Sequence, residues 1–362
     1  MRRLLLAAAA CLLGPAIASA QPSCNNTNEI LMSWPTVNPV WQFCWVRPTA
    51  SSGANGSGLE IRQAYYNGHL VMKRGGVPIL NVKYDPGGCG GTGLCYRDWL
   101  TTEIEYLSNN PISTGYAEPT CPPVTVCDDP TGVDACDIVP PPPDCTRECF
   151  LGVSAEKLAD RLIMTSQNEA GWYRYKMSWT FYLDGRIEPR FGFTAVADPC
   201  TNFTHRHHAY WRFDFDIDGP DGDVVTEGTN PAAAPGRPGP KPPAIVIATE
   251  AVRRNNRPDM TWSIVDSTTH RGYRVVPGDE TELPADSFSV ADAWFLNYNP
   301  NEIDDSGQGP GCNAKISNFV NGESLANDLV MWYRTGALHA GGDLDHCHVV
   351  GPTLVPVGDW SP

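Results

Sequence analysis

The chain is 362 residues long and carries 41 acidic against 26 basic side chains, which gives a formal net charge of -15. This acidic balance argues against a nucleic-acid partner, because phosphate binding needs clustered Lys and Arg, and it mildly favours cationic ligands. The length is enough for a large hydrophobic core, in one big β domain or in two ordinary domains.

Residues 1–20 have the pattern of a secretory signal peptide. Two arginines at positions 2 and 3 precede an apolar run over residues 4–17, and small residues end the segment. No later segment is apolar enough to span a membrane. We therefore expect a mature chain from residue 21 that is secreted or periplasmic. Thirteen cysteines less Cys11, which leaves with the signal peptide, gives twelve that we expect to form disulfides.

Strands dominate the rest of the predicted structure. Short β-type runs lie between turn residues over 55–98, and a hairpin is expected over 172–195 with its turn at Asp184-Gly185. Pro189 cannot donate a ladder hydrogen bond, so its strand is predicted to be bulged or at an edge. Further strands are expected at 244–249, 260–265, 273–276, 293–298 and 328–333. The fold class is all-β: a large, mostly antiparallel β-sandwich with long loops and few short helices.

Two segments depart from the strand pattern. Residues 119–149 hold five cysteines and a proline run with little apolar content, which is typical of a disulfide-stapled surface insertion. Over residues 154–162, Ser154 could cap a short helix whose face is formed by Leu158, Ala159 and Leu162.

The clearest pattern in the chain is a period of two over residues 204–219, THRHHAYWRFDFDIDG. Alternate side chains of a strand share a face. One face carries His205, His207, Trp211, Phe213, Phe215 and Ile217. The other face carries Arg212, Asp214, Asp216 and Asp218. The sequence thus predicts two imidazoles directed into an apolar interior and a carboxylate ladder directed away from it.

Two ligand sets on one strand indicate two kinds of metal. Buried imidazoles suit copper, zinc or iron, whereas clustered carboxylates suit hard cations such as calcium or manganese. A third histidine is needed to fix a catalytic metal while leaving one position open. His339 follows the strand-like run 328–338, whereas His346 and His348 flank Cys347 in a Gly- and Asp-rich loop. We favour His339 and expect that loop at the surface.

The run from His205 to Gly219 resembles the copper-ligand strand of the copper-containing, topaquinone-dependent amine oxidases, in which H-x-H is followed by R-x-D-x-D-x-D-G. The register agrees at every one of those positions. The run ending at His339 is similar to the family strand that supplies the third copper histidine. Other segments follow the family in order, at 41–47, 58–86, 262–278 and 293–302. The resemblance covers most of residues 21–362, corresponds to the family's C-terminal catalytic domain alone, and leaves out the cysteine-rich insertion.

The resemblance implies two metal sites. The implied copper ligands are His205, His207 and His339. The implied ligands of a second, peripheral site for calcium or manganese are Asp214, Asp216, Asp328 and the carbonyls of Phe215 and Leu329. In the family this second site is structural, and we expect no chemistry there.

The resemblance also implies a cofactor made from the chain itself. Tyr173 matches the tyrosine that copper and oxygen convert into topaquinone. Asp98 matches the catalytic base, which needs a pKa tuned near the working pH. Tyr84 matches the tyrosine that hydrogen-bonds the quinone, and Tyr96 matches an aromatic gate to the substrate channel.

These residues motivate a leading hypothesis: a secreted, homodimeric enzyme that uses O2 to oxidise a primary amine to an aldehyde, releasing ammonia and hydrogen peroxide. Two departures motivate an alternative. Trp172 and Arg174 flank Tyr173 where the family has Asn and an acidic residue, and Asp98 lacks the following Gly-Glu. The alternative is a catalytically impaired member that binds copper or calcium in a structural or ligand-binding role. A third hypothesis is a different mononuclear metalloenzyme with the same three histidines.

Overall fold

The computed structural model describes residues 21–24, 27–84, 95–97, 104–105, 113–114, 153–170, 173–195, 198–230, 243–255, 259–278, 288, 290–305, 315–325, 327–343 and 348–362. The expected signal peptide and the cysteine-rich insertion lie outside these residues. Within them, no helix has both the length and the apolar character needed to cross a membrane.

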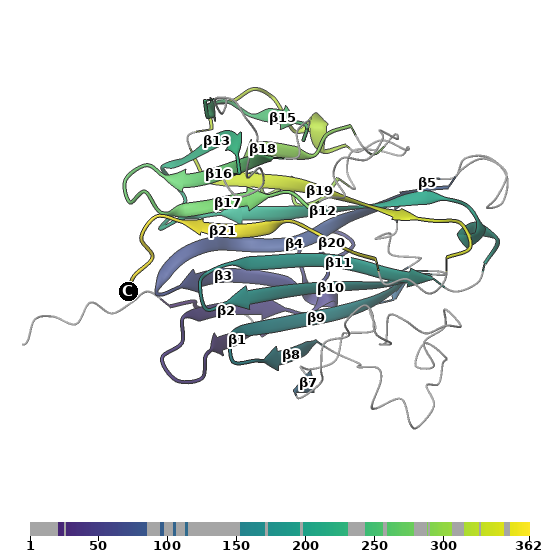
Figure 1. The fold of residues 1–362 in the computed structure, drawn as a ribbon, viewed down its shortest axis with the longest axis horizontal. Helices are drawn as coiled ribbons and strands as arrows, with labels where there is room; N and C mark the ends of the chain where they lie inside the picture. Colours follow the sequence, from purple (N-terminus) through teal and green to yellow (C-terminus); the bar gives the residue numbers. More distant parts are fainter. Residues whose placement is uncertain are drawn as a thin grey trace, which may run out of the picture.

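The described strands form two sheets, antiparallel throughout except for one short pair, so the predicted all-β class is confirmed. The first sheet contains, in order, β1 (Glu29–Trp34), β2 (Trp41–Val46), β3 (Glu60–Tyr66), β4 (His69–Lys83), β12 (His205–Phe215), β19 (Leu329–His339), β18 (Ala293–Asn297) and β15 (Ala251–Arg253), with β5 (Cys95–Arg97) beside β4. Figure 1 shows the long strands of the molecule running roughly along its longest axis.

The second sheet contains, in order, β14 (Ile245–Ile247), β13 (Asp223–Thr229), β16 (Met260–Asp266), β17 (Gly272–Val276), β21 (Thr353–Val357), β11 (Ile187–Ala195), β10 (Tyr173–Tyr182), β9 (Arg161–Ala170), β8 (Ser154–Lys157) and β7 (Ser113–Thr114). Beside it lie β20 (His348–Val350), which pairs with β11, and β6 (Ile104–Glu105), which pairs with β9. Short 3-10 turns occur at η1 (Pro48–Ala50), η3 (Pro199–Asn202) and η6 (Ile316–Asn318). The predicted strands at 244–249, 260–265, 273–276 and 293–298 correspond to β14, β16, β17 and β18.

Aromatic side chains fill the space between the two sheets. Trp179 of β10 meets Trp211 of β12 edge-on at 5.3 Å between ring centroids, and Phe43 stacks on Phe181 at 4.5 Å. In each strand every second side chain points toward the opposite sheet, so each of these pairs joins one sheet to the other. Burying aromatic rings of this size is the main stabilising contribution of the sandwich.

The outer face of the first sheet is buried as well. A second apolar cluster lies on this face, with Ala291, Ile316 and Phe319 from outside the sheet packed with side chains of its own strands, Ile79, Tyr210, Trp294, Leu296, Val330 and Trp332. On the same face Arg212 is only 3% exposed, and Asp214 and Asp216 are 0% and 4% exposed. Of the predicted carboxylate ladder, Asp214 and Asp216 turn away from the main core and are nevertheless buried, whereas Asp218 lies beyond the end of β12 and is exposed.

The helix predicted over 154–162 is wrong. This segment forms β8, a turn and the start of β9, with Ala155 opposite Met164 across the hairpin. Leu162, Met164 and Ala155 all join the main core. A helix of nine residues has little intrinsic stability, so burial of alternate residues beside β10 decides the conformation.

Pro189 lies inside the second sheet. Its strand is not at an edge, and it is not bulged where it pairs with β10. On one side it sits opposite Trp179 of β10. On the other side, β11 pairs with β21 at Ile187 and with β20 from Phe191 onward. Pro189 falls between these two pairings, where the ladder is already interrupted and a missing N–H group is tolerated.

Disulfides are present, as predicted for the cysteines. Cys24 is bonded to Cys44, with 5.6 Å between their Cα atoms, which ties the start of the described chain to β2. Cys200 is also disulfide-bonded. Bonds of this kind are typical of proteins that fold in oxidising compartments.

Candidate metal centre

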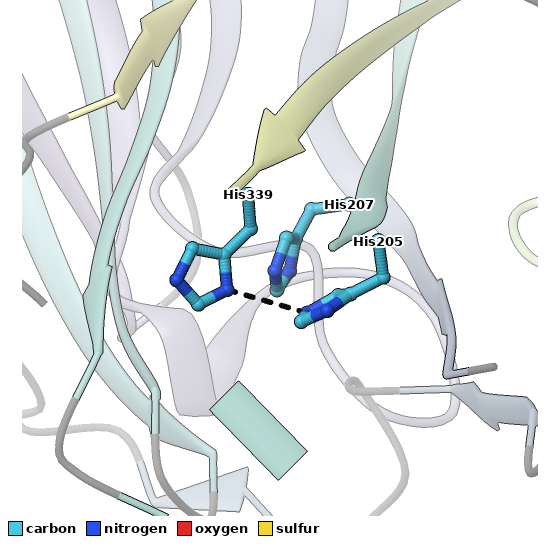
Figure 2. A group of neighbouring side chains, drawn as sticks. All are labelled: His205, His207 and His339. Atoms are coloured by element: carbon cyan, nitrogen blue, oxygen red, sulfur yellow. Dashed lines mark hydrogen bonds between the residues drawn. The ribbon is translucent and has the colours of Figure 1, made fainter. Parts of the chain in front are cut away.

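Three buried histidines meet where two neighbouring strands of the first sheet end. His205 lies directly opposite His339 in the pairing of β12 with β19, and His207 is two residues along β12 on the same face. One ring nitrogen of each lies within 4.8 Å of the other two. Figure 2 shows the three rings converging at the end of the two strands. We call these residues the imidazole cluster; of the other third-ligand candidates, His346 and the His348 side chain lie outside the described residues.

Backbone carbonyls determine which nitrogens face the centre. His205 Nδ1 lies 2.5 Å from the carbonyl oxygen of Phe203, and His339 Nε2 lies 2.6 Å from that of Asp343. Because a carbonyl oxygen only accepts, each of these nitrogens carries the ring proton. His205 Nε2 and His339 Nδ1 then each carry a lone pair. These two acceptor nitrogens lie 3.5 Å apart, along the dashed line in Figure 2.

Tyr173 of β10 reaches this pair of lone pairs from the opposite sheet. Its hydroxyl oxygen lies 2.7 Å from His205 Nε2 and 2.7 Å from His339 Nδ1. One phenol proton serves only one of two acceptors. The two nitrogens and the phenol oxygen together therefore form a donor set that a cation would satisfy.

Burial keeps the histidines in the form that binds metal. It lowers the pKa of His205 to about 4, against the opposing effect of the Phe203 carbonyl. Burial likewise lowers the pKa of His339, and the Asp343 carbonyl opposes this shift. Both imidazoles are neutral at neutral pH, as metal ligation requires. Three imidazole nitrogens next to a phenol oxygen fit copper, zinc or iron better than calcium.

Sequence reasoning missed Tyr175 as part of this centre. Its hydroxyl oxygen lies 2.9 Å from His207 Nδ1, and its ring stacks with that of Tyr173 at 5.6 Å. Phe193 packs on the His207 ring at 4.1 Å. The signal was available, because the period of two in the hairpin places Tyr175 on the face of Tyr173.

The structure describes the other implied active-site residues to different extents. Tyr84 follows β4 directly, is 2% exposed, and has its ring centroid 4.6 Å from that of His205. Tyr96 lies on β5 opposite Val82, which is itself opposite His207, but only its backbone is described. Asp98 lies outside the described residues.

A second group of ligand atoms lies on the outer face of the same two strands. Asp214, Asp216 and Asp328 each bring a carboxylate oxygen within 4.8 Å of the others. Phe215 is opposite Leu329 in the strand pairing, so their backbones border this group. Each of the three carboxylates has one buried oxygen without a hydrogen-bond partner among the described residues. We call the three the carboxylate cluster; its oxygens are the donors that a hard cation prefers.

Two basic side chains partly neutralise the carboxylate cluster. Lys73 Nζ lies 3.0 Å from Asp328 Oδ2, and Arg212 Nη1 lies 3.3 Å from Asp214 Oδ2. Burial nevertheless raises the pKa values of Asp214 and Asp216, and the neighbouring carboxylates raise them further. Two cationic groups thus do not fully compensate three carboxylates. Sequence reasoning missed Lys73, because only the pairing of β4 with β12 brings it here.

Comparison with solved structures identifies the fold. An amine oxidase from Aspergillus nidulans has a TM-score of 0.60 at 15% identity, covering 98% of this chain and 55% of that one. A copper-containing benzylamine oxidase from Hansenula polymorpha has a TM-score of 0.57 at 15% identity, covering 96% and 64%. A lysyl oxidase from Pichia pastoris has a TM-score of 0.56 at 13% identity, covering 88% and 51%.

At the level of sequence there is no comparable match. No family model and no curated protein matches the chain. The chain spans between about half and two thirds of the length of the three oxidases. It therefore shares with these amine oxidases, one of them copper-containing, the fold of its two-sheet sandwich.

Proposed function

We propose that this protein is a secreted copper-dependent amine oxidase that converts a primary amine, O2 and water into an aldehyde, ammonia and hydrogen peroxide. The observation that carries the proposal is the Tyr173 hydroxyl, which lies 2.7 Å from one lone pair of each of two neutral histidines. A tyrosine held in this way is positioned for oxidation by a metal in the imidazole cluster. The amine oxidase fold supports the same reading.

The proposed copper ligands are His205, His207 and His339. Copper and a quinone derived from Tyr173 would supply the two-electron oxidation of the amine and the reduction of O2 to peroxide. The carbonyls of Phe203 and Asp343 hold two of the ligand rings in the correct tautomer before metal arrives, as partners outside the ligand shell commonly do. The complete burial of Tyr173 and His207 excludes bulk water from the reacting centre.

Three further residues complete the proposed active site. Asp98 would take the proton from the carbon that bears the amino group. Tyr84, whose ring lies against His205, would donate a hydrogen bond to the modified Tyr173. Tyr96 would control entry of the amine, and its backbone position two strands from His207 is compatible with that role.

We assign a structural cation to the carboxylate cluster. Calcium or manganese would bind Asp214, Asp216 and Asp328 together with the carbonyls of Phe215 and Leu329. The support is the unpartnered buried oxygen on each carboxylate, since isolated buried charge is costly unless a cation compensates it. A homodimer is part of the same proposal, and light scattering of the purified protein tests it.

The test is reconstitution of the apoprotein with copper in air. We expect a visible quinone absorption band, reaction with phenylhydrazine, and peroxide release on addition of a primary amine. Tyr173→Phe should bind copper and give none of these signals. Tyr182→Phe, at the far end of the same strand, is the matched control and should behave as the wild type. A wild-type protein indistinguishable from Tyr173→Phe would refute the oxidase.

The second candidate is a catalytically impaired relative that keeps its metals for stability or ligand binding. It is favoured by Trp172 and Arg174, which flank Tyr173 in place of the residues found in the family. Copper binding without quinone formation would support this candidate. Amine-dependent peroxide release would exclude it.

A further inference from the structure

Two surface loops each hold one of the histidines that contact Tyr173. The loop before β12 presents the carbonyl oxygen of Phe203 to His205 Nδ1, at 2.5 Å. The loop after β19 presents the carbonyl oxygen of Asp343 to His339 Nε2, at 2.6 Å. In both rings the other nitrogen is the one that lies 2.7 Å from the Tyr173 hydroxyl. The position of each loop therefore sets the orientation of one ring.

Two hydrogen bonds and one close approach join these loops. Gly342 N–H donates to the carbonyl oxygen of Thr201 at 2.8 Å, and Gly341 N–H donates to Thr204 Oγ1 at 3.1 Å. A Cβ atom added to Gly341 would lie 2.4 Å from the carbonyl oxygen of Asn202 and 2.9 Å from its carbonyl carbon. Both neighbours are backbone atoms, so the loops can meet in this way only if residue 341 is a glycine. We call these five residues the loop clasp.

The loop before β12 is also anchored independently of the loop clasp. The Asp198 side chain accepts a hydrogen bond from Cys200 N–H at 2.8 Å, and Thr201 Oγ1 donates to the Asp198 carbonyl oxygen at 2.8 Å. Cys200 is disulfide-bonded, and Thr201 is fully buried. The loop after β19 closes a turn in which Asp343 N–H donates to the carbonyl oxygen of Ala340 at 3.0 Å. The loop clasp thus attaches this turn to a fixed support.

We propose that Gly341 is a positioning residue of the proposed copper site, because the loop clasp fixes the separation of the two loop carbonyls and thereby the orientation of both rings. A partner outside the ligand shell commonly orients a single ligand. Here one junction between loops orients two, His205 and His339, toward the same point. The inference rests on the proposed function for its copper readout, but the orientation of the rings is measurable in the apoprotein as well.

Gly341→Ala in the full chain tests the inference, because it forces the loops apart and leaves every proposed ligand in place. We expect copper affinity to fall by about tenfold to a hundredfold and the electron paramagnetic resonance spectrum of bound Cu²⁺ to change. In the apoprotein, the nitrogen NMR signals of the His205 and His339 rings should shift, since both carbonyl contacts are altered. Gly228→Ala is the matched control: its Cβ would make an ordinary contact, 3.9 Å from the Cβ of Ala244, and all three readouts should stay unchanged.

Two substitutions of Thr204 test the loop clasp from its other side. Thr204→Val keeps the shape of the side chain and removes the oxygen that accepts the hydrogen bond from Gly341. Because Thr204 is exposed, we expect copper affinity to fall by only about threefold, as for a weak single hydrogen bond. Thr204→Ser keeps the oxygen and should retain the affinity of the wild type.

Wild-type copper affinity and spectrum in Gly341→Ala would overturn the inference, as would an equal loss in Gly228→Ala. Unchanged ring signals in the apo form of Gly341→Ala would also overturn it, because the rings would then not depend on the loop clasp. If Gly341→Ala does not fold, equal affinities of Thr204→Val and Thr204→Ser would decide against the inference. A wild-type protein that binds no copper would refute the proposed function, and the ring signals of the apo variants would still test the loop clasp. Copper binding without quinone would refute the oxidase alone.

Discussion

The imidazole cluster and the carboxylate cluster occupy opposite faces of the same two strands, β12 and β19, and manage charge in opposite ways. His205 and His339 are neutral at neutral pH because burial lowers their pKa values, and a backbone carbonyl fixes the outward nitrogen of each. The three carboxylates depend on Lys73 and Arg212, and one oxygen of each is without a partner among the described residues. The first cluster is ordered before metal binds, whereas the second needs a cation to remove residual repulsion. The comparison implies that a metal bound to the imidazole cluster should enable chemistry, whereas a cation bound to the carboxylate cluster should raise stability.

The largest expected effect tests the inner face. His339→Ala removes one of the two lone pairs that meet at Tyr173, so copper affinity should fall by more than about a hundredfold, beyond the loss caused by an outer partner. Quinone formation should be abolished. Isothermal titration with copper and the visible spectrum measure both effects. His270→Asn changes an exposed histidine and should alter neither; copper binding retained by His339→Ala would remove this residue from the ligand set.

The next effect tests the outer face. Asp216→Asn removes a buried carboxylate whose pKa is raised mainly by burial and further by Asp214. Without calcium, the variant should be more stable than the wild type by roughly 1–3 kcal/mol near pH 8, because the energetic cost of that buried charge is gone. Added calcium should no longer raise its thermal midpoint.

Asp221→Asn is the control for this substitution, because Asp221 is exposed on the same stretch of chain. It should keep the calcium response of the wild type. If Asp216→Asn responds to calcium as strongly as Asp221→Asn does, the carboxylate cluster is not the calcium site.

The two faces should also differ in how pH affects stability. The pKa of His205 is lowered in the folded protein, so its contribution is complete above its ordinary value of 6.5 and is lost as pH falls toward about 4. The pKa values of Asp216 and of Asp223, whose pKa burial raises to about 8, lie above the ordinary 3.8. The folded state keeps these protons where the unfolded chain has lost them, so stability falls as pH rises through the folded pKa values.

Urea denaturation of the apoprotein separates these contributions. Between about pH 6.5 and pH 8 the raised pKa values of Asp216 and Asp223 are crossed, and the free energy of unfolding should drop by roughly 1–3 kcal/mol. Asp216→Asn should show a smaller drop, and Asp223 should account for most of the rest. A free energy that rises over this interval would contradict the raised carboxyl pKa values.

The period of two along β12 is why so much of the site could be predicted from sequence. This alternation alone assigns His205 and His207 to one face and Asp214 and Asp216 to the other, without knowledge of the strand pairing. What alternation does not encode is which strand lies next door. Lys73 joins the carboxylate cluster only through β4. This contact depends on pairing register, which a single strand does not specify.

The same limit explains the failed helix and the buried ladder. Residues 154–162 satisfy a local helical pattern, but burial of Ala155 and Leu162 in the sandwich outweighs it. A strand with Asp at alternate positions ordinarily has one solvated face. The apolar residues that lie on this face include Trp332 and Trp294 of the neighbouring strands and Phe319 from outside the sheet; all are remote in sequence from β12, and no local pattern assigns them to it.

The smallest expected effect concerns Lys73, a basic side chain beside the carboxylate cluster. Its ammonium group lies against Asp328, one of the proposed cation ligands, so calcium must compete with it. Because the Lys73 side chain is 40% exposed, the ion pair stabilises the protein by about 1 kcal/mol or less. Lys73→Met should therefore lower apo stability slightly and tighten calcium binding by about fivefold, the fold-change that corresponds to an energy of that size. Terbium luminescence titration measures the affinity, with the exposed Lys157→Met as control. Weaker calcium binding in Lys73→Met than in Lys157→Met would mean that the lysine assists the cation site, and the carboxylate cluster would then need its basic neighbours even when a cation is bound.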